Sequence, residues 1–245
     1  MRKIRVDRLL VEKGLAPSHE KARALVYAGV VRAGKIVVEK PGKAVDPGLS
    51  LEVDTAPHPF VSRGGVKLEK ALAEFEVEVL GRVALDIGAS SGGFTHCLLL
   101  RGIKRVYAVD VGYGQLAWEI RQDPRVKVME RVNARYLTPG DIGETVDILV
   151  VDASFISLKL IIPPLLPLVK GEGEIIALIK PQFEVGKGKV GKGGVVRSEE
   201  DHLKVIEDLS LFFKERGLKV MGITESPIQG AKGNREFFIY LINKA

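Results

Sequence analysis

Four charged residues stand where the surrounding apolar pattern does not predict a charge. They interrupt, end or precede apolar runs, and they are Lys67, Asp152, Lys180 and Glu236. Charges at the ends of buried strands cost free energy unless they are paired, so each indicates a site, although a single strand-end charge more often only reaches water. A buried amine can accept the proton of a hydroxyl group, and a carboxylate can orient either partner. Four such charges in one chain indicate a catalytic site more strongly than any one of them does.

A glycine-rich turn is the second chemical feature of the same region. The apolar run Val83–Ile87 is typical of a buried strand, and it leads into "DIGASSGGFT" and then into a helical pattern. Glycines let the backbone turn sharply and approach a ligand, while the first N–H groups of the helix donate to its polar atoms. The spacing leaves three interpretations open, namely a dinucleotide site, a hydrolase nucleophile elbow and a site for S-adenosylmethionine.

The first two interpretations each meet an obstacle. A dinucleotide site of the form G-x-G-x-x-G needs glycine at position 90, where Ser90 stands. The residues from Gly88 to Gly92 do spell G-x-S-x-G, and the order Ser90, Asp152, His202 suits a hydrolase triad. However, His202 follows a capping-box pattern at a helix start, whereas a catalytic histidine of that class is better placed on a loop.

The acidic residue that closes the second predicted strand favours S-adenosylmethionine. Asp110 ends "RVYAVD", 22 residues after Gly88, and a carboxylate there can accept hydrogen bonds from both hydroxyls of a ribose. Asn133, after the third strand, is expected to contact the adenine edge. The candidate cofactor-binding residues are Asp86, Gly88, Ser90, Gly92, Gly93, Phe94, Asp110, Val111, Asn133 and Asp152.

The elements that must position these residues read as an α/β fold. Apolar runs rich in β-branched residues alternate with helical patterns after residue 61, which predicts a mostly parallel sheet covered on both faces. Ligands of such sheets bind beyond the carboxyl ends of the strands. The predicted strands are Val83–Ile87, Val106–Val109, Val126–Met129, Ile148–Val151, Ile175–Ile179, Val220–Thr224 and Phe237–Leu241.

The first quarter of the chain predicts a separate basic module. Residues 1–60 carry 11 Lys and Arg against 7 Asp and Glu, whereas the remaining 185 residues carry 26 against 24. Such an excess is typical of a nucleic-acid-binding module, and equally of a solvated basic face without a partner. Pro57-His58-Pro59 favours an extended connector, so we expect domains at 1–56 and 62–245 with a linker at 57–61.

Within this module, two helical patterns that end at Gly14 and Gly29 precede a hairpin at 30–38 and a strand at 49–53. The segment "RVDRLLVEKGLAPSHEKARALVYAGVVRAGKIVV" resembles the small αL-type RNA-binding domain of a small-subunit ribosomal protein, pseudouridine synthases and tyrosyl-tRNA synthetases. The resemblance implies that its basic helix face meets RNA phosphates, contacts that position RNA with little sequence choice.

Farther along, "GKGKVGKGG" at 186–194 nearly spells a phosphate-binding loop, but it lacks the Ser or Thr and the helix that must follow. We therefore expect a basic loop over the active site. The candidate RNA-binding residues are Arg5, Arg8, Lys21, Arg23, Arg32, Lys35, Arg63, Lys187, Lys189, Lys192 and Arg235.

The order Lys67, Asp152, Lys180, Glu236 around the glycine turn matches the K-D-K-E tetrad of FtsJ-like ribose 2′-O-methyltransferases. With "SRGGVKL", "DVGYGQL", "VVDASFISL" and "GAKGNREFF", the chain from about residue 3 to 241 resembles the TlyA (hemolysin A) family. The resemblance implies a Rossmann-like class I methyltransferase sheet, S-adenosylmethionine as cofactor, and methylation of cytidine ribose in 16S or 23S ribosomal RNA, or both, within ribosomal subunits.

For that reaction each tetrad residue has an expected role. Lys180 is expected to take the hydroxyl proton and Lys67 to supply positive potential. Glu236 orients a lysine or the ribose, and Asp152 lies between cofactor and acceptor. In-line attack on a methyl carbon depends mostly on orientation, which four converging side chains can provide.

Composition disfavours other classes. Cys97 is the only cysteine and the first thirty residues show no signal-peptide pattern, so we expect a cytoplasmic protein. No stretch reaches the roughly 18 apolar residues of a membrane span, which argues against a membrane-active hemolysin. An RNA-binding protein with an inactive methyltransferase fold is the other alternative. The four histidines are too scattered for a metal site, and no expectation follows for the oligomeric state.

Overall fold

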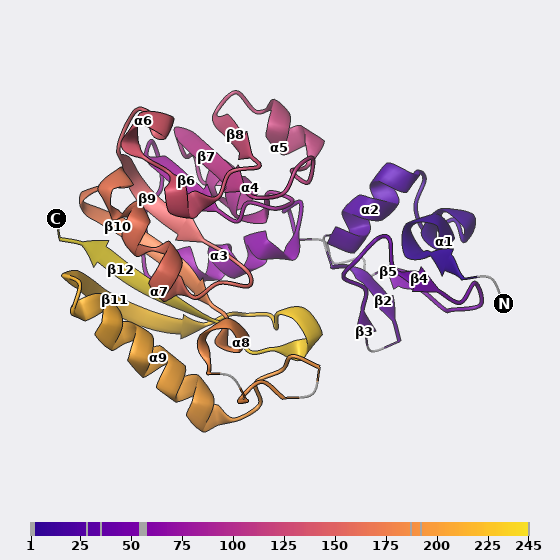
Figure 1. The fold of residues 1–245 in the computed structure, drawn as a ribbon. Coiled ribbons are helices and arrows are strands. Elements are labelled where there is room, and N and C mark those ends of the chain that lie inside the picture. The colour runs from indigo at the N-terminus through magenta and orange to yellow at the C-terminus, as the bar shows by residue number, and fades with distance from the viewer. Residues whose placement is uncertain are drawn as a thin grey trace.

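The computed structural model of the 245-residue chain describes residues 3–27, 29–34, 36–53, 58–186, 188–191 and 193–244. The predicted linker begins at Pro57, which lies outside the described residues, as do three RNA-binding candidates, Lys35, Lys187 and Lys192. Figure 1 shows a small N-terminal unit beside a larger α/β unit, joined next to the start of helix α3 (Arg63–Glu74). Among the described residues, none of the helices combines the length and apolarity needed to cross a membrane.

A seven-stranded mixed sheet forms the centre of the larger unit, with strand order β11-β12-β10-β9-β6-β7-β8. Five neighbouring strands are parallel, and β12 runs antiparallel to both β10 and β11. The α/β fold predicted from the sequence is confirmed. The strands are β6 (Val83–Ile87), β7 (Arg105–Asp110), β8 (Val126–Glu130), β9 (Val146–Val151), β10 (Val169–Ile179), β11 (Leu218–Glu225) and β12 (Phe237–Asn243).

Helices cover both faces of this sheet because its central strands are apolar on both sides. One face packs against Leu68 of α3, Leu98 of α4 and Ile120 of α5, and the other against Leu165 and Phe213. Helix α9 lies along β11 (Figure 1). The helical elements are α3, α4 (Gly93–Leu100), α5 (Trp118–Gln122), η1 (Ala134–Tyr136), α6 (Pro139–Ile142), α7 (Leu158–Ile161), η2 (Pro163–Leu168), α8 (Pro181–Glu184), α9 (Glu199–Lys214) and η3 (Ala231–Gly233).

The strand order reverses between β6 and β9, and this is where such sheets bind ligands. Ile87 and Val151 are paired at the carboxyl ends of these strands, and the Asp152 N–H donates to the Ile87 carbonyl at 2.9 Å. Gly88 follows with a φ of +83°, and a Cβ there would lie 2.6 Å from the Asp152 carbonyl oxygen. Only glycine fits at this position, so the glycine turn and Asp152 can lie side by side.

The N-terminal unit has a hydrophobic core of its own, which includes Val6, Leu10, Val26 and Val31. The two predicted helices, the hairpin and the following strand are present. The pairing of β1 with β4 was not predicted from the sequence. The elements are β1 (Ile4–Arg5), α1 (Val6–Glu12), α2 (His19–Tyr27), β2 (Val31–Ala33), β3 (Ile36–Val37), β4 (Ala44–Val45) and β5 (Glu52–Val53).

Candidate active site

Two adjoining cavities open at the carboxyl ends of β6 and β9. The larger has a volume of about 460 Å³ and the smaller about 180 Å³. Gly88, Ser90 and Asp152 line both. A split cavity at the switch point of an α/β sheet can hold an extended ligand in one part and a second reactant in the other.

The glycine turn shapes the wall between strand β6 and helix α4. Ser90 has a φ of +48° and Gly92, which precedes the helix, has a φ of +94°. Gly93 and Phe94 line the smaller cavity, and a Cβ on Gly93 would collide with the Ser62 hydroxyl. The turn therefore brings backbone close to any ligand in the cavities, as the sequence predicts for this motif.

Asp110 closes strand β7 at the larger cavity. Its Oδ2 accepts from the Ser90 N–H at 2.8 Å and its Oδ1 from the Gly112 N–H at 2.7 Å. The carboxylate thus ties the glycine turn to the next loop while facing the cavity that Val111 and Asn133 also line. Each carboxylate oxygen has a further acceptor site left for a ligand hydroxyl.

Asp86 lies behind the turn and is absent from the lining of both cavities. It is fully buried, and its Oδ2 accepts a hydrogen bond from the Thr95 hydroxyl at 2.6 Å. Burial raises the pKa of this carboxyl to about 7. Gly92 likewise does not line either cavity. Asp86 and Gly92 were predicted to bind the cofactor, but neither is in contact with the space of the two cavities; Asp86 holds Thr95 of α4, and Gly92 packs toward Leu116 and Ile120.

The four predicted catalytic residues are brought together in two ion pairs. Lys67 Nζ of α3 lies 2.6 Å from Glu236 Oε2, next to strand β12, and both side chains are almost fully buried. Lys180 Nζ, directly after β10, lies 2.6 Å from Asp152 Oδ1. Burial alone would raise the pKa of Asp152. The nearby Lys180 and Lys67 outweigh burial and hold that pKa below its usual value, so Asp152 stays ionised.

Ser154 is a residue of this cluster that the sequence did not single out. Its Oγ accepts a hydrogen bond from Lys180 Nζ at 2.9 Å, and it lines the larger cavity. Phe155 follows with a φ of +64°, and its ring is 90% exposed at the cavity rim. The signal available in the sequence was the position of both residues just beyond Asp152, at the end of a buried strand.

The hydrolase interpretation lacks its histidine. His202 is buried at the start of α9, where its Nε2 contacts the Val196 carbonyl at 3.0 Å. The Ser90 hydroxyl instead faces Gln115 Oε1 at 3.5 Å.

Cys97 is buried beside Glu69, and both burial and that carboxylate raise the pKa of its thiol. In the described ranges, no cluster of three or more His, Cys, Asp or Glu side chains could hold a metal ion.

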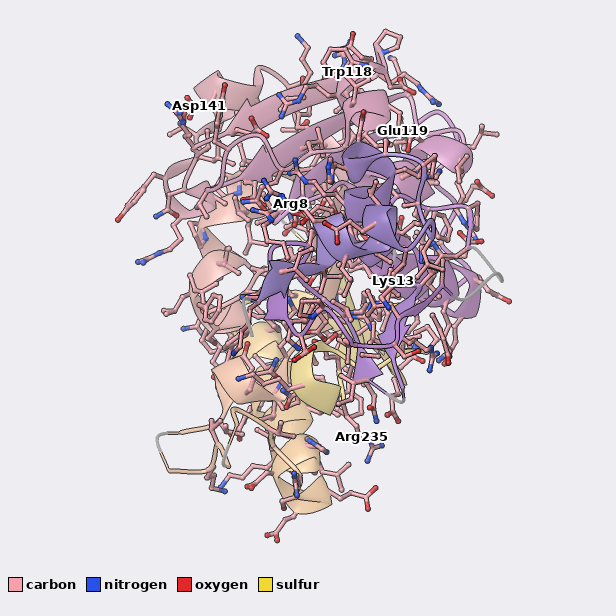
Figure 2. All side chains as sticks on the ribbon, turned by 90° about the vertical axis from the view of Figure 1, so that its right-hand side faces the viewer. Arg8, Lys13, Trp118, Glu119, Asp141 and Arg235 are labelled. Carbon is pink, nitrogen blue, oxygen red and sulfur yellow. The ribbon has the colours of Figure 1, made fainter. Side chains whose placement is uncertain are left out.

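Arg8, Lys21, Arg23 and Arg32, among the described RNA-binding candidates, are exposed on the N-terminal unit. Figure 2, which views the molecule from that unit, shows Arg8 in front and Arg235 lower down. Five ion pairs within the chain also involve candidates, namely Arg5 with Asp7, Arg63 with Glu39, Lys189 with Asp201, and Arg235 with Glu225 and Glu199. The two ion pairs of Arg235 are exposed on both sides, and because exposed ion pairs contribute little to stability, an RNA phosphate can replace the carboxylates there.

The amino-acid sequence of this chain matches a known protein family. The profile of the FtsJ-like methyltransferases matches residues 60–243. The chain is 47% identical over 241 residues to "16S/23S rRNA (cytidine-2'-O)-methyltransferase TlyA" of Mycobacterium tuberculosis, covering 98% of this chain and 90% of the relative. It is 37% identical over 240 residues to "Hemolysin A" of Brachyspira hyodysenteriae, covering 98% of this chain and 100% of the relative.

A solved structure agrees with these matches. The structure of a candidate hemolysin from Streptococcus thermophilus superimposes with a TM-score of 0.79 at 44% identity, covering 99% of this chain and 89% of that one. The two sequence matches and the structural match each cover 98% or 99% of this chain. The chain therefore belongs to the FtsJ-like methyltransferase family and, within it, to the group that contains TlyA and hemolysin A.

Proposed function

We propose that this chain transfers a methyl group from S-adenosylmethionine to the 2′-hydroxyl of cytidine in ribosomal RNA, within ribosomal subunits. The observation that carries the proposal is the meeting of two lysines and two carboxylates beside a cavity at the switch point of the sheet. The family and the activity for which the Mycobacterium tuberculosis relative is named support the same reaction.

We propose that the larger cavity holds the cofactor. Its volume of about 460 Å³ suits a nucleoside with a side arm, and Gly88 and Ser90 of the glycine turn line it. We propose that Asp110 holds the ribose hydroxyls, Asn133 contacts the adenine, and the backbone at Gly88 and Ser90 receives the amino-acid end. When bound, the cofactor supplies an electrophilic methyl group on a positively charged sulfur.

The chain's own residues then prepare the acceptor. The tetrad is balanced in charge, with two lysines against two carboxylates. A lysine side chain takes a proton only as the neutral amine. We assign to Lys180 Nζ the task of receiving the 2′-hydroxyl proton as the oxygen forms its bond to the methyl carbon and the carbon–sulfur electron pair returns to sulfur. Lys67, held by Glu236, favours the oxyanion, and Asp152 orients Lys180.

We propose that the N-terminal unit binds the RNA. Its exposed Arg8, Lys21 and Arg23 present positive charge along α1 and α2, as contacts with phosphates require. We propose domains at 1–56 and 62–245 with a linker at 57–61, so that RNA affinity and chemistry reside in separate units. Lys189 and Arg235 would add contacts near the active site by exchanging their carboxylate partners for phosphates.

Transfer of a labelled methyl group onto separated, unmodified small and large ribosomal subunits tests the proposal. The wild-type chain is expected to label at least one RNA, and Lys180→Met and Asp152→Ala are expected to lose that activity. Ser210→Ala, on α9 with its hydroxyl bonded to the Ile206 carbonyl, is a matched control that retains it. A folded protein that binds S-adenosylmethionine but labels neither RNA would overturn the proposal in favour of an inactive RNA-binding protein.

A further inference from the structure

Lys180 Nζ has a second partner in the active site besides Asp152. The nitrogen lies 2.6 Å from Asp152 Oδ1 and donates to Ser154 Oγ at 2.9 Å. Asp152 directly follows β9 and Ser154 stands two residues later, where both line the larger cavity. The residue after it, Phe155, adopts a left-handed backbone conformation, and the chain bends immediately beyond the serine.

The geometry of a lysine amine makes the second partner significant. Lysine carries its nitrogen on a flexible four-carbon stem, and its ammonium group has three donor positions. One acceptor leaves the group free to swing about that contact, whereas two acceptors fix the nitrogen and direct its third position. With the Asp152 ion pair and the Ser154 hydrogen bond next to two of these positions, the third is left for the acceptor hydroxyl. In the neutral amine, the form that can take the hydroxyl proton, this third position is the lone pair.

We propose that Ser154 is a positioning residue of the methyl transfer, whose hydroxyl acts with the Asp152 carboxylate to fix Lys180 Nζ toward the reacting oxygen. The inference rests on the proposed function, in which Lys180 receives the hydroxyl proton. Misplacement of a reacting group by about 1 Å can cost on the order of 100-fold in rate, so one weak hydrogen bond can matter here.

The serine does not carry the fold. Ser154 is exposed at the cavity. Within the described part of the chain, its side chain makes one hydrogen bond, the one from Lys180. An exposed serine-to-alanine change of this kind is normally within about 0.5 kcal/mol of neutral in stability. A loss of activity in Ser154→Ala would thus report on the active site and not on unfolding.

The test compares Ser154→Ala, Ser154→Thr and the control Ser210→Ala in the full-length protein. For Ser154→Ala we expect kcat to fall about 10- to 100-fold, with the KM for RNA and the affinity for S-adenosylmethionine unchanged within about twofold. Ser154→Thr, which keeps the hydroxyl, is expected to restore most of kcat.

A second readout needs neither cofactor nor RNA. The rate at which an acylating reagent modifies Lys180 at fixed pH, measured by peptide mass spectrometry, is expected to rise in Ser154→Ala and to remain at the wild-type value in Ser210→Ala. Wild-type labelling and wild-type kcat in Ser154→Ala would overturn the inference, and so would a kcat loss matched by an equal loss of cofactor affinity. If the wild-type chain methylates no RNA, the proposed function fails, while the labelling result still decides whether Ser154 holds Lys180.

Discussion

Replacing Asp86 with asparagine tests whether the carboxyl group beneath the glycine turn is neutral in the folded protein. Asp86 is fully buried, with Oδ2 accepting from Thr95 and Oδ1 lacking a partner among the described side chains and backbone. Burial, reinforced by repulsion from Asp152, raises its pKa from 3.8 to about 7. Asparagine has nearly the shape of the protonated acid and carries no charge at any pH.

The sign and size of the effect follow from linkage. Between about pH 4 and pH 7 the native state keeps a proton on Asp86 that the unfolded chain releases, so stability falls as pH rises through this window and is constant above it. One pKa unit corresponds to about 1.4 kcal/mol, and a rise of about three units corresponds to at most about 4 kcal/mol over the window. Asp86→Asn lacks this slope, so it should gain about 1.4 kcal/mol per pH unit relative to wild type between pH 5 and pH 6.5.

Urea unfolding of wild type and Asp86→Asn at half-unit steps from pH 5 to pH 8 measures this difference. Asp141→Asn is the matched control, because hydrogen bonds from Thr138 lower the pKa of Asp141, so that it stays ionised throughout this range in both states. Parallel stability curves for wild type and Asp86→Asn from pH 5 to pH 7 would refute a neutral Asp86. Parallel curves together with a loss of S-adenosylmethionine affinity would return Asp86 to the cofactor site.

Lys67→Met should lower the free energy of unfolding by about 3–5 kcal/mol in urea, because it leaves the buried Glu236 carboxylate without its cation. Adding Glu236→Gln should recover part of that loss, and purely additive losses in the double variant would contradict the pairing. Asp110→Ala should weaken S-adenosylmethionine binding by about 10- to 100-fold in calorimetry, since charge-assisted hydrogen bonds to ribose are lost; unchanged affinity would remove Asp110 from the site. The Cys97 thiol, whose pKa is raised by burial and by Glu69, should resist a thiol-specific disulfide reagent at pH 8 until the chain is unfolded; rapid reaction of the native protein would contradict its burial.

Much of the catalytic unit could be predicted from the sequence because its strands are buried on both faces. Each therefore reads as an unbroken apolar run, and the run Val83–Ile87 coincides with β6 residue for residue. The predicted start of a strand was wrong where that strand extends out of the hydrophobic core. Strand β10 begins at Val169, six residues before the expected Ile175, because residues 170–172 are exposed and carry no apolar signal. Pairing of the two-residue strands β1 and β4 had too little pattern to detect.

The site was predictable where a charge interrupts a buried pattern, and less so where a contact depends on tertiary approach. Lys67 stands out on its helix for that reason, but its partner Glu236 is 169 residues away. Ser154 carries no charge, so its position just beyond Asp152 was the one signal for it in the sequence, and the contact with Lys180 shows its place in the site. The ion pair of Arg235 with Glu225 likewise forms only when β11 and β12 pair.

The position of the transferred methyl group tests the central claim most directly. Alkali cleaves RNA through the free 2′-hydroxyl, so a 2′-O-methyl group protects the neighbouring phosphodiester bond. After transfer of a labelled methyl group onto unmodified ribosomal subunits, we expect the label in an alkali-stable dinucleotide that yields 2′-O-methylcytidine, and none with Lys180→Met. Label released in alkali-sensitive mononucleotides, as from a methylated base, would contradict the assignment of the two lysines and two carboxylates to chemistry on a ribose oxygen.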